Sequence, residues 1–339
     1  MNILMVSINF YPSIGGIEII TENLANEFVR KGHKVTIITR TPNNEKIKKF
    51  PFKVLRSPSY FDLFKAYKQC DVYIHQSISL KYVWPLLLIK KPFFIVYHQV
   101  GWEKGIKGQI KKFTSLFAHN ICVSKTTANA YHLKKYNIIY NAYNDNIFKC
   151  TNDKNNRQDI TFVGRLHRDK GVYLLIDAFN EFKKETKSNY HLNIIGDSSE
   201  RSKIKNYAAR TEFASDIYFL GEMQPEQISQ ILNKTHIQAV TSTLPYREAF
   251  GIVALEGLAC GCIVIGSNGD GIEEALHSAG LIYKNGNQQD LCEKIIKAYY
   301  MTYEEQMEKR LLAKQWIEKR ELSKVAEEYI NLLKDASNI

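Results

Sequence analysis

Residues 2–39 read NILMVSINFYPSIGGIEIITENLANEFVRKGHKVTIIT. Asn2–Ile8 has the apolar, β-branched composition of a buried strand, and Glu18–Lys31 spaces its apolar residues as an amphipathic helix does. Gly32 ends this helix, and Lys34–Thr39 returns to a strand pattern. A strand, a helix and a strand in such close succession predict a βαβ unit, and therefore an α/β fold with a parallel sheet.

The same alternation continues along the chain and then restarts. Further strands of the first half are expected at Val72–His75, Pro92–His98, Ile121–Val123 and Ile138–Asn141. Residues 149–159 (KCTNDKNNRQD) lose all apolar periodicity and predict a linker. The second half is expected to hold strands at Ile160–Gly164, Leu192–Gly196, Ile217–Leu220, Ile237–Thr241 and Cys262–Ser267, and helices at Gly171–Glu185, Phe250–Cys260 and Gln288–Tyr300. This pattern predicts two doubly wound domains, with ligands bound at the carboxyl ends of the strands.

Length and composition agree with two globular domains. The chain has 339 residues, of which 45% are hydrophobic and 24% charged, so it is neither wholly disordered, nor collagen-like, nor a multispanning membrane protein. Its longest apolar stretch, Tyr82–Tyr97, is divided by Lys90 and Lys91 into pieces too short to cross a bilayer. The N-terminus is expected to be a strand and not a signal peptide. None of the six cysteines forms a CxxC pair, which favours reduced structural thiols in a cytoplasmic protein.

The charge is divided unevenly between the halves. Residues 1–150 carry 22 Lys and Arg against 8 Asp and Glu, a net charge of +14, whereas residues 151–339 carry 24 against 27. A basic half of this kind indicates a polyanionic partner: a nucleic acid, an anionic bilayer or a phosphorylated substrate.

The loop after the first strand contains two adjacent glycines. It reads YPSIGGIE over residues 11–18, and Gly15 and Gly16 stand where the following helix begins. Glycines allow backbone N–H groups to approach a ligand closely, and a helix N-terminus favours anions. A purely structural turn is the alternative reading.

The segment GRLHRDKG, residues 164–171, joins a strand to a helix in the second half. Arg165 and Lys170 flank the loop at the expected ligand-binding edge. A guanidinium and an ammonium that converge there suit a diphosphate. Two solvated cations in a polar loop are the alternative.

The segment EAFGIVALE, residues 248–256, opens another helix. Glu248 precedes the helix, and Glu256 lies within its otherwise apolar turns. Because a buried carboxylate is costly without a partner, Glu256 needs ligand hydroxyls, a cation or an internal salt bridge. The amides of Phe250 and Gly251 at the helix start can meet a sugar hydroxyl or a phosphate.

These motifs, in this order, resemble the retaining GT-B glycosyltransferases of family 4 over nearly the whole chain. YPSIGGIE resembles the family's N-terminal glycine loop, GRLHRDKG its Gly-Arg-Leu…Lys-Gly signature, and EAFGIVALEGLACG its E-x7-E signature. The resemblance implies two Rossmann-like domains that face each other across a cleft. They are an acceptor-binding domain at residues 1–148, then the linker 149–159, a donor-binding domain at 160–315, and a closing helix within 316–339 that returns to the first domain.

The resemblance also implies roles for residues. Arg165 and Lys170 would neutralise the donor diphosphate with help from the Gly15-Gly16 loop, Glu248 would contact the sugar, and Glu256 would hold the ribose. His98, after the strand Pro92–Tyr97, would lie near the sugar 6-hydroxyl, with a packed structural histidine as the alternative. The remaining donor-binding residues implied are Gly164, Gly196, Asp197, Gly221, Glu222, Ala249, Phe250, Gly251 and Ile252.

The implied reaction is a metal-independent hexosyl transfer with retention of configuration. The acceptor attacks on the face that the diphosphate leaves, and a phosphate oxygen takes the proton. The chain has no Asp-x-Asp motif, and we expect no metal or other cofactor because the Arg/Lys pair replaces the cation. The departure Asp197-Ser198-Ser199, where the family often has a second glycine and a proline, puts base recognition in question.

The acceptor is expected at the basic first domain. Residues 104–117 (KGIKGQIKKFTSLF) place Ile106, Ile110, Phe113 and Phe117 on one helical face, beside Lys104, Lys107, Lys111 and Lys112. Such a helix suits an anionic leaflet, whereas an ordinary helix would turn its apolar face to the sheet. We therefore expect a lipid-linked glycan acceptor at the inner face of the cytoplasmic membrane, as in O-antigen, lipopolysaccharide, capsule or glycolipid assembly.

Other classes of protein stay open at this point. A UDP-sugar 2-epimerase shares the fold and needs no acceptor, and a sugar-nucleotide binder could lack turnover. A basic chain with 12% aromatic residues could bind nucleic acid by stacking, but it contains no RNA-binding signature, so no nucleic-acid partner is expected. UDP and GDP are the nucleotides expected, and the sugar and the linkage do not follow from the residues.

Overall fold

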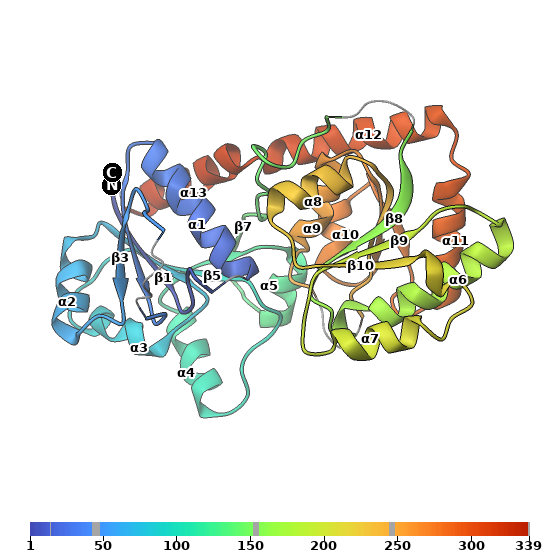
Figure 1. Ribbon diagram of the computed structural model, residues 1–339. Helices are drawn as coiled ribbons and strands as arrows, with labels where there is room; N and C mark the ends of the chain where they lie inside the picture. The colour runs from blue at the N-terminus through green and yellow to red at the C-terminus, as the bar shows by residue number, and fades with distance from the viewer. Residues whose placement is uncertain (14, 43–47, 152–155, 244–247, 338–339) are drawn as a thin grey trace. The chain divides into compact units, whose positions relative to one another are not determined.

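The computed structural model describes residues 1–13, 15–42, 48–151, 156–243 and 248–337. The chain forms two compact units (Figure 1). Unit 1 comprises Met1–Ala142 and Leu322–Ile339, and unit 2 comprises Tyr143–Glu321. The segment 149–159, expected as a linker, belongs to unit 2, and its residues 152–155 lie outside the described residues.

Unit 1 contains a seven-stranded, parallel sheet with the order β3-β2-β1-β4-β5-β6-β7. Its strands are β1 (Asn2–Ser7), β2 (Lys34–Thr39), β3 (Lys53–Arg56), β4 (Val72–Gln76), β5 (Phe93–Tyr97), β6 (His119–Cys122) and β7 (Asn137–Ile138). The central strands β4 and β5 are buried along their whole length. Burial on both faces explains the unbroken apolar run FFIVY of β5, whereas β4 ends in the buried polar residues His75 and Gln76.

Helices cover both faces of this sheet. They are α1 (Gly16–Arg30), α2 (Tyr60–Gln69), α3 (Leu80–Val83), the 3₁₀ helix η1 (Trp84–Leu87), α4 (Ile106–Ser115), α5 (Lys125–Tyr131) and α13 (Leu322–Ser337). Side chains of α2, α3 and α5 share one core with Leu4 and Val6 of β1. α4 is shorter than the expected 104–117 because Gly105 has a positive φ and precedes its first turn.

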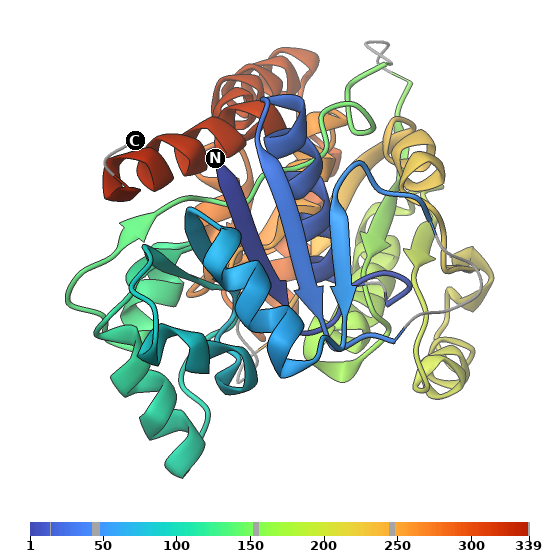
Figure 2. The ribbon, with the colours of Figure 1, turned by 90° about the vertical axis from the view of Figure 1, so that its left-hand side faces the viewer.

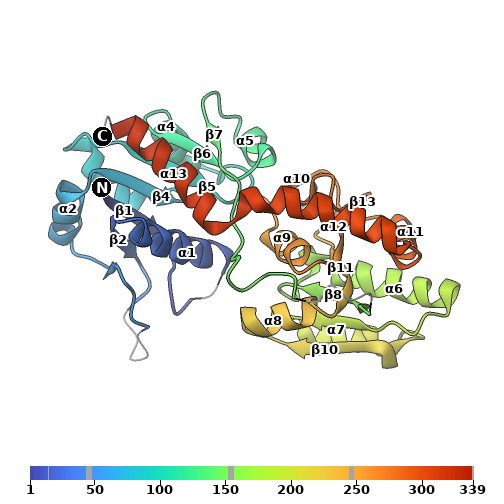
Figure 3. The same cartoon turned by 90° about the horizontal axis from the view of Figure 1, so that it is seen from above.

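The last helix packs against the first, as Figure 3 shows from above. The ring of Phe28 lies edge-on to that of Tyr329, with centroids 6.3 Å apart, and Lys31 Nζ lies 3.6 Å from a Glu327 carboxylate oxygen. α13 therefore completes unit 1 although it is the C-terminal end of the chain.

Unit 2 repeats the design with a six-stranded parallel sheet, in the order β10-β9-β8-β11-β12-β13. Its strands are β8 (Gln158–Val163), β9 (Leu192–Ile195), β10 (Ile217–Gly221), β11 (Thr235–Val240), β12 (Ile263–Ser267) and β13 (Leu281–Tyr283). Its helices are η2 (Arg168–Lys170), α6 (Val172–Thr186), α7 (Arg201–Ala208), η3 (Ala214–Asp216), α8 (Pro225–Leu232), α9 (Ile252–Ala259), α10 (Gly271–Leu276), α11 (Gln288–Tyr299), α12 (Tyr303–Ile317) and η4 (Glu318–Arg320).

The predicted α/β class is confirmed, and both sheets are doubly wound. In each sheet the strand order reverses beside the first strand of the unit, so ligand-binding loops are expected at the carboxyl ends of β1 and β4 and of β8 and β11. The sequence did not predict β3, β13, α2, α3, α5, α7, α8 or α10, each of which is ten residues long or shorter. No helix in the described part of the chain is long and apolar enough to cross a membrane.

Candidate functional site

Three predicted glycines meet where β8, β9 and β10 end. Gly164 donates its N–H to Ile195 O, and Gly196 donates to Gly221 O at 2.8 Å. A Cβ on Gly196, whose φ is +132°, would lie only 1.9 Å from the Gly164 carbonyl oxygen. Glycine is therefore required here by the close approach of two backbones, which leaves this edge of the sheet without side-chain bulk.

The predicted diphosphate loop folds back over the end of β11. Thr241 Oγ1 donates to Lys170 O at 2.9 Å, and a Cβ on Gly171 would lie 1.9 Å from Thr241 O. Arg165 is exposed and forms no ion pair with the described residues. An unpaired guanidinium beside a tightly held loop is suited to bind an anion.

The two signature segments are joined by an ion pair between Lys170 Nζ and Glu248 Oε1. Each side chain is about one-quarter exposed, and the same carboxylate oxygen accepts from Ser242 Oγ at 3.2 Å. Burial lowers the pKa of Lys170, and nearby Arg165 lowers it further. Segments far apart in the sequence thus form one partly desolvated charged site in unit 2.

The loop from Glu248 to the start of α9 rests on the next strand connection. Asp270 Oδ2 accepts from the Glu248 N–H at 3.4 Å, while its Oδ1 caps α10 by accepting from Ile272 N at 2.9 Å. A Cβ on Gly271 would lie 2.3 Å from Ala249 O, so this contact also needs glycine. Asp270 is buried and braces the backbone of Glu248.

The helix that follows begins at Ile252, two residues later than expected, because Gly251 has a φ of +83° and caps it. Phe250 is buried, which anchors the loop. The first amides of α9 have no partner within the helix, so they form a donor-rich terminus next to Ala249 and Glu248.

Glu256 lies in the second turn of α9 and is partly buried. Its carboxylate makes no hydrogen bond or ion pair with any residue that the structure describes, which removes the internal salt bridge considered from the sequence. Burial raises its pKa from 4.5 to about 7. Glu256 is therefore a desolvated carboxyl group that lacks a partner among the described residues.

The segment expected to face the base has a local function as well. Asp197 Oδ2 accepts from Arg201 Nη1 at 3.0 Å, and its Oδ1 accepts from Ser198 N. The Asp197 carboxylate is thus already hydrogen-bonded to Arg201 and Ser198, whereas the resemblance implied only a contact with the donor. Glu222 is exposed just beyond Gly221. Arg201, which has no counterpart in the motifs recognised in the sequence, was missed.

In unit 1, His98 follows β5 and pairs with Gln76 at the end of β4. The distance from His98 Nε2 to Gln76 Oε1 is 2.6 Å, and Nε2 donates because an amide oxygen only accepts. Burial lowers the pKa of His98 to about 4, which favours the neutral ring. His98 Nδ1 has no hydrogen-bond partner among the described residues. Gln76, which sequence reasoning missed, also lines a hollow of about 430 Å³ with Ser7, Asn9, Trp102 and Glu103.

The glycine loop of unit 1 is described except for Ile14. Gly15 caps α1 in an extended conformation, and a Cβ there would lie 2.4 Å from Glu18 Oε2. Gly16 is the first residue of the helix, with open space at its Cβ position. The amides at this helix end face no side-chain cap among the described residues.

α4 turns its apolar face to solvent and not to the sheet. Ile106 is 76% exposed and Phe117, just beyond the helix, is 71% exposed, so the ordinary amphipathic packing considered from the sequence is wrong. Lys111 differs from the other predicted lysines because its Nζ lies 2.6 Å from Glu103 Oε2 and it lines the unit 1 hollow. Lys104, Lys107 and Lys112 are exposed.

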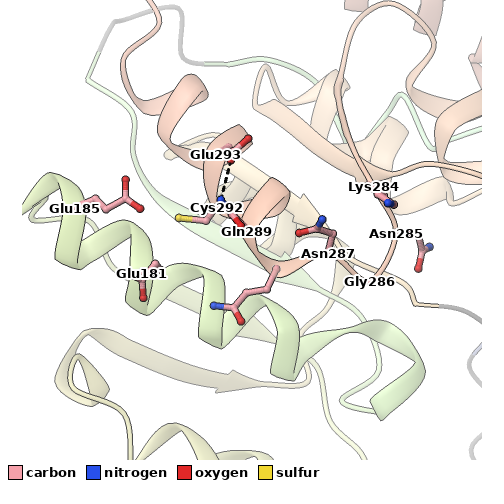
Figure 4. A pocket seen from close by; sticks show the side chains of 10 residues that line it. Glu181, Glu185, Lys284, Asn285, Gly286, Asn287, Gln289, Cys292 and Glu293 are labelled. Carbon is pink, nitrogen blue, oxygen red and sulfur yellow. Dashed lines mark hydrogen bonds between the residues drawn. The ribbon is translucent and has the colours of Figure 1, made fainter.

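A further hollow, of about 910 Å³, lies between α6 and α11 on unit 2 (Figure 4). Its wall includes Glu181, Glu185 and Glu293, and it contains none of the predicted site residues. Asn285 on its rim donates to Ser242 O at 3.0 Å, which ties the loop after β13 to the Lys170–Glu248 site.

The comparisons with known proteins agree with this architecture. The family model "Glycosyl transferases group 1" matches residues 144–319, a little over half of the chain, and "Glycosyltransferase Family 4" matches residues 14–146. The chain belongs to the group 1 glycosyltransferases.

Relatives and solved structures of the same kind cover nearly the whole chain. An uncharacterized glycosyltransferase of Methanocaldococcus jannaschii is 30% identical over 88% of each chain. A human protein, one of the subunits of phosphatidylinositol N-acetylglucosaminyltransferase, is 26% identical over 88% of this chain and 68% of its own length. The crystal structure of Anabaena HepE in complex with UDP has a TM-score of 0.82 at 17% identity, over 99% of this chain and 100% of that one. These similarities establish the GT-B fold.

We expect a pH-dependent stability difference at Glu256. Because the folded protein keeps a proton on this carboxyl group up to about pH 7, whereas the unfolded chain releases it near 4.5, stability falls as the pH rises through this window. Glu256→Gln removes the charge. The free energy of unfolding of this variant should exceed that of the wild type by up to about 3 kcal/mol at pH 8 and by little at pH 4.5. Urea unfolding without nucleotide at both pH values measures this. An equal difference in stability between variant and wild type at both pH values would contradict the raised pKa of Glu256. The control is Glu222→Gln, which changes an exposed glutamate.

Proposed function

We propose that the protein transfers a sugar, with retention of configuration, from a nucleoside-diphosphate sugar to a hydroxyl of a lipid-linked glycan acceptor at the inner face of the cytoplasmic membrane. The transferase activity is supported above all by the contact between Lys170 and Glu248, because it brings the segments 164–171 and 248–256 together in one site. Assembly of a surface polysaccharide or a glycolipid is the proposed setting.

The ion pair suggests how the site responds to its donor. A diphosphate brings two negative charges to Arg165 and Lys170, and it competes with Glu248 for the ammonium group. Once released, the Glu248 carboxylate accepts hydrogen bonds from sugar hydroxyls. Glu256 binds the ribose, since it is desolvated and without a partner in the described part of the chain.

Catalysis then rests on stabilising the leaving group. As the sugar–phosphate bond breaks, Arg165 and Lys170 neutralise the charge that develops on the diphosphate, helped by the amides at Gly15 and Gly16. The acceptor hydroxyl attacks from the same face and passes its proton to a phosphate oxygen. His98 is neutral, so in this scheme it positions a hydroxyl through Nδ1 and transfers no proton.

A lipid acceptor is supported by α4, whose apolar face is exposed beside lysines. The name of the human relative likewise includes phosphatidylinositol, a membrane lipid. Basic amphipathic helices of this kind bind anionic leaflets reversibly, with about 1 kcal/mol contributed by each lysine near the surface.

The donor is tested first, by thermal shifts with UDP, GDP, ADP, CMP and dTDP. We expect one diphosphate, UDP being the first choice given the UDP bound to HepE, to stabilise the protein by about 2.7 kcal/mol at 100 times its Kd. The shift should survive EDTA, and Glu256→Gln should reduce it. No shift with any nucleotide would contradict the proposed donor site, and loss of the shift in EDTA would contradict metal independence.

Removing either cation should impair turnover more than folding. Arg165→Ala and Lys170→Ala are each expected to lower kcat roughly 10²–10³-fold, because they remove charge that acts on the leaving group. The measurement is release of the nucleoside diphosphate from the donor. Arg168→Ala changes an exposed residue of the same loop and is the control. Near-normal turnover in Arg165→Ala or Lys170→Ala would refute the diphosphate assignment.

The membrane part is tested by flotation with vesicles that contain anionic phospholipid. A triple variant of the exposed lysines in and just before α4 (Lys104→Glu, Lys107→Glu, Lys112→Glu) should bind at least tenfold more weakly than the wild type. The matched control changes three exposed lysines of unit 2: Lys203, Lys297 and Lys314. Absence of wild-type binding would refute docking without affecting the donor assignment.

A further inference from the structure

Exposed apolar side chains are concentrated on one part of unit 1. Among the described residues, nine large apolar side chains are more than 60% exposed, and eight of them lie between residues 60 and 117. Four belong to α4 and the residues just after it: Ile106, Phe113, Leu116 and Phe117. The other four are not explained by α4: Tyr60 and Phe61 at the start of α2, and Leu87 and Leu88 at the end of η1.

These four side chains come from adjoining elements. The ring of Trp84 in η1 lies 5.9 Å from that of Tyr60 and stacks on that of Phe64 at 6.3 Å. α2 and the first three strands face the viewer in Figure 2. We refer to Tyr60, Phe61, Leu87 and Leu88 as the α2–η1 surface.

A basic hollow of about 520 Å³ opens beside α2. Lys34 and Lys53 are the first residues of β2 and β3, and Lys65 comes from α2, one turn after Phe61. All three lysines are exposed and form no ion pair with the described residues. Asp62 is the single carboxylate in the described lining, and its Oδ2 already accepts from Ser59 Oγ at 2.6 Å.

This hollow is separate from the candidate active site. Its residues lie at the amino ends of β1–β3, whereas His98, Gln76 and the glycine loop lie at the carboxyl ends. Three uncompensated ammonium groups suit a phosphate group, and a neighbouring aromatic pair suits the boundary between headgroups and acyl chains.

Charge selects the occupant of this surface. Residues 60–117 carry nine lysines against three acidic residues, so an anionic leaflet complements the apolar side chains and the lysines together.

We propose that unit 1 has a second membrane contact, independent of α4: the α2–η1 surface enters the interface, and Lys34, Lys53 and Lys65 hold the phosphate of an anionic lipid headgroup. This inference rests on the proposed action at a membrane. With α4, it would supply two contacts on unit 1, and two contacts restrict the orientation of a docked protein more than one does.

Two variants of the full-length protein test the proposal by flotation with vesicles of phosphatidylcholine containing about 30% phosphatidylserine. One replaces the apolar side chains: Tyr60→Ser, Phe61→Ser, Leu87→Ser and Leu88→Ser. The other replaces the lysines: Lys34→Gln, Lys53→Gln and Lys65→Gln. Each should bind at least tenfold more weakly although α4 is intact. The controls are Tyr300→Ser with Tyr303→Ser, and glutamine at Lys203, Lys297 and Lys314, all exposed in unit 2.

The outcomes separate this inference from the proposed function. Wild-type binding that is lost in the α4 variant but kept in both new variants would overturn the second contact alone. Absence of wild-type binding would overturn both. Inorganic phosphate or glycerol phosphate at about 10 mM should not displace the wild type from vesicles; displacement by either would mean that the hollow takes a soluble phosphorylated ligand. An unchanged thermal shift with the donor nucleotide shows that each variant is folded.

Discussion

Every paired strand in the two sheets is parallel, and this constraint decides where the chemistry of the chain lies. Parallel strands need crossover helices, so their carboxyl ends, and the loops that follow them, gather at one edge of each sheet. The loops after β8, β11 and β12 bring together Lys170, Glu248 and Asp270 although their motifs are far apart in the chain. Close backbone contacts at Gly171, Gly196 and Gly271 make this convergence possible.

Desolvation is the second theme of the site. It lowers the pKa of Lys170 and of His98 and raises that of Glu256, in each case because a charge is costly away from water. Lys170 is compensated by Glu248, and His98 stays neutral beside Gln76. Glu256 has neither an ion-pair partner nor a hydrogen-bond partner among the described residues, which makes it the group most in need of a ligand.

The two units differ in what they leave exposed. Unit 2 places the charged side chains of its candidate site in loops at the ends of strands, whereas unit 1 exposes large apolar side chains beside lysines along α2, η1 and α4. In water such a surface is unfavourable, and its position beside unpaired lysines favours an anionic lipid surface over an apolar protein groove. In the proposed function, unit 2 binds the donor and unit 1 binds the membrane, which would suit an enzyme whose two substrates differ in solubility.

The sequence by itself determined the α/β class, the alternation of strands and helices, and the segments that build the site. These depend on local periodicity and on glycines at positions where a side chain would clash with the backbone. It also singled out Arg165, Lys170, Glu248 and Glu256. Only the tertiary structure decided which groups pair. Lys170 meets Glu248, and the N–H of Glu248 meets Asp270, in each case across more than twenty residues of the chain.

The same holds for exposure. The pattern of residues 104–117 fits a helix packed on a sheet as well as one lying on a membrane, since an apolar face looks the same in both. Tyr60 and Leu87 carry no sequence signal at all, and their exposure follows from how α2 and η1 pack. Such long-range pairing and burial depend on residues that are distant in the chain but close in space, and a local sequence pattern does not specify which residues those are.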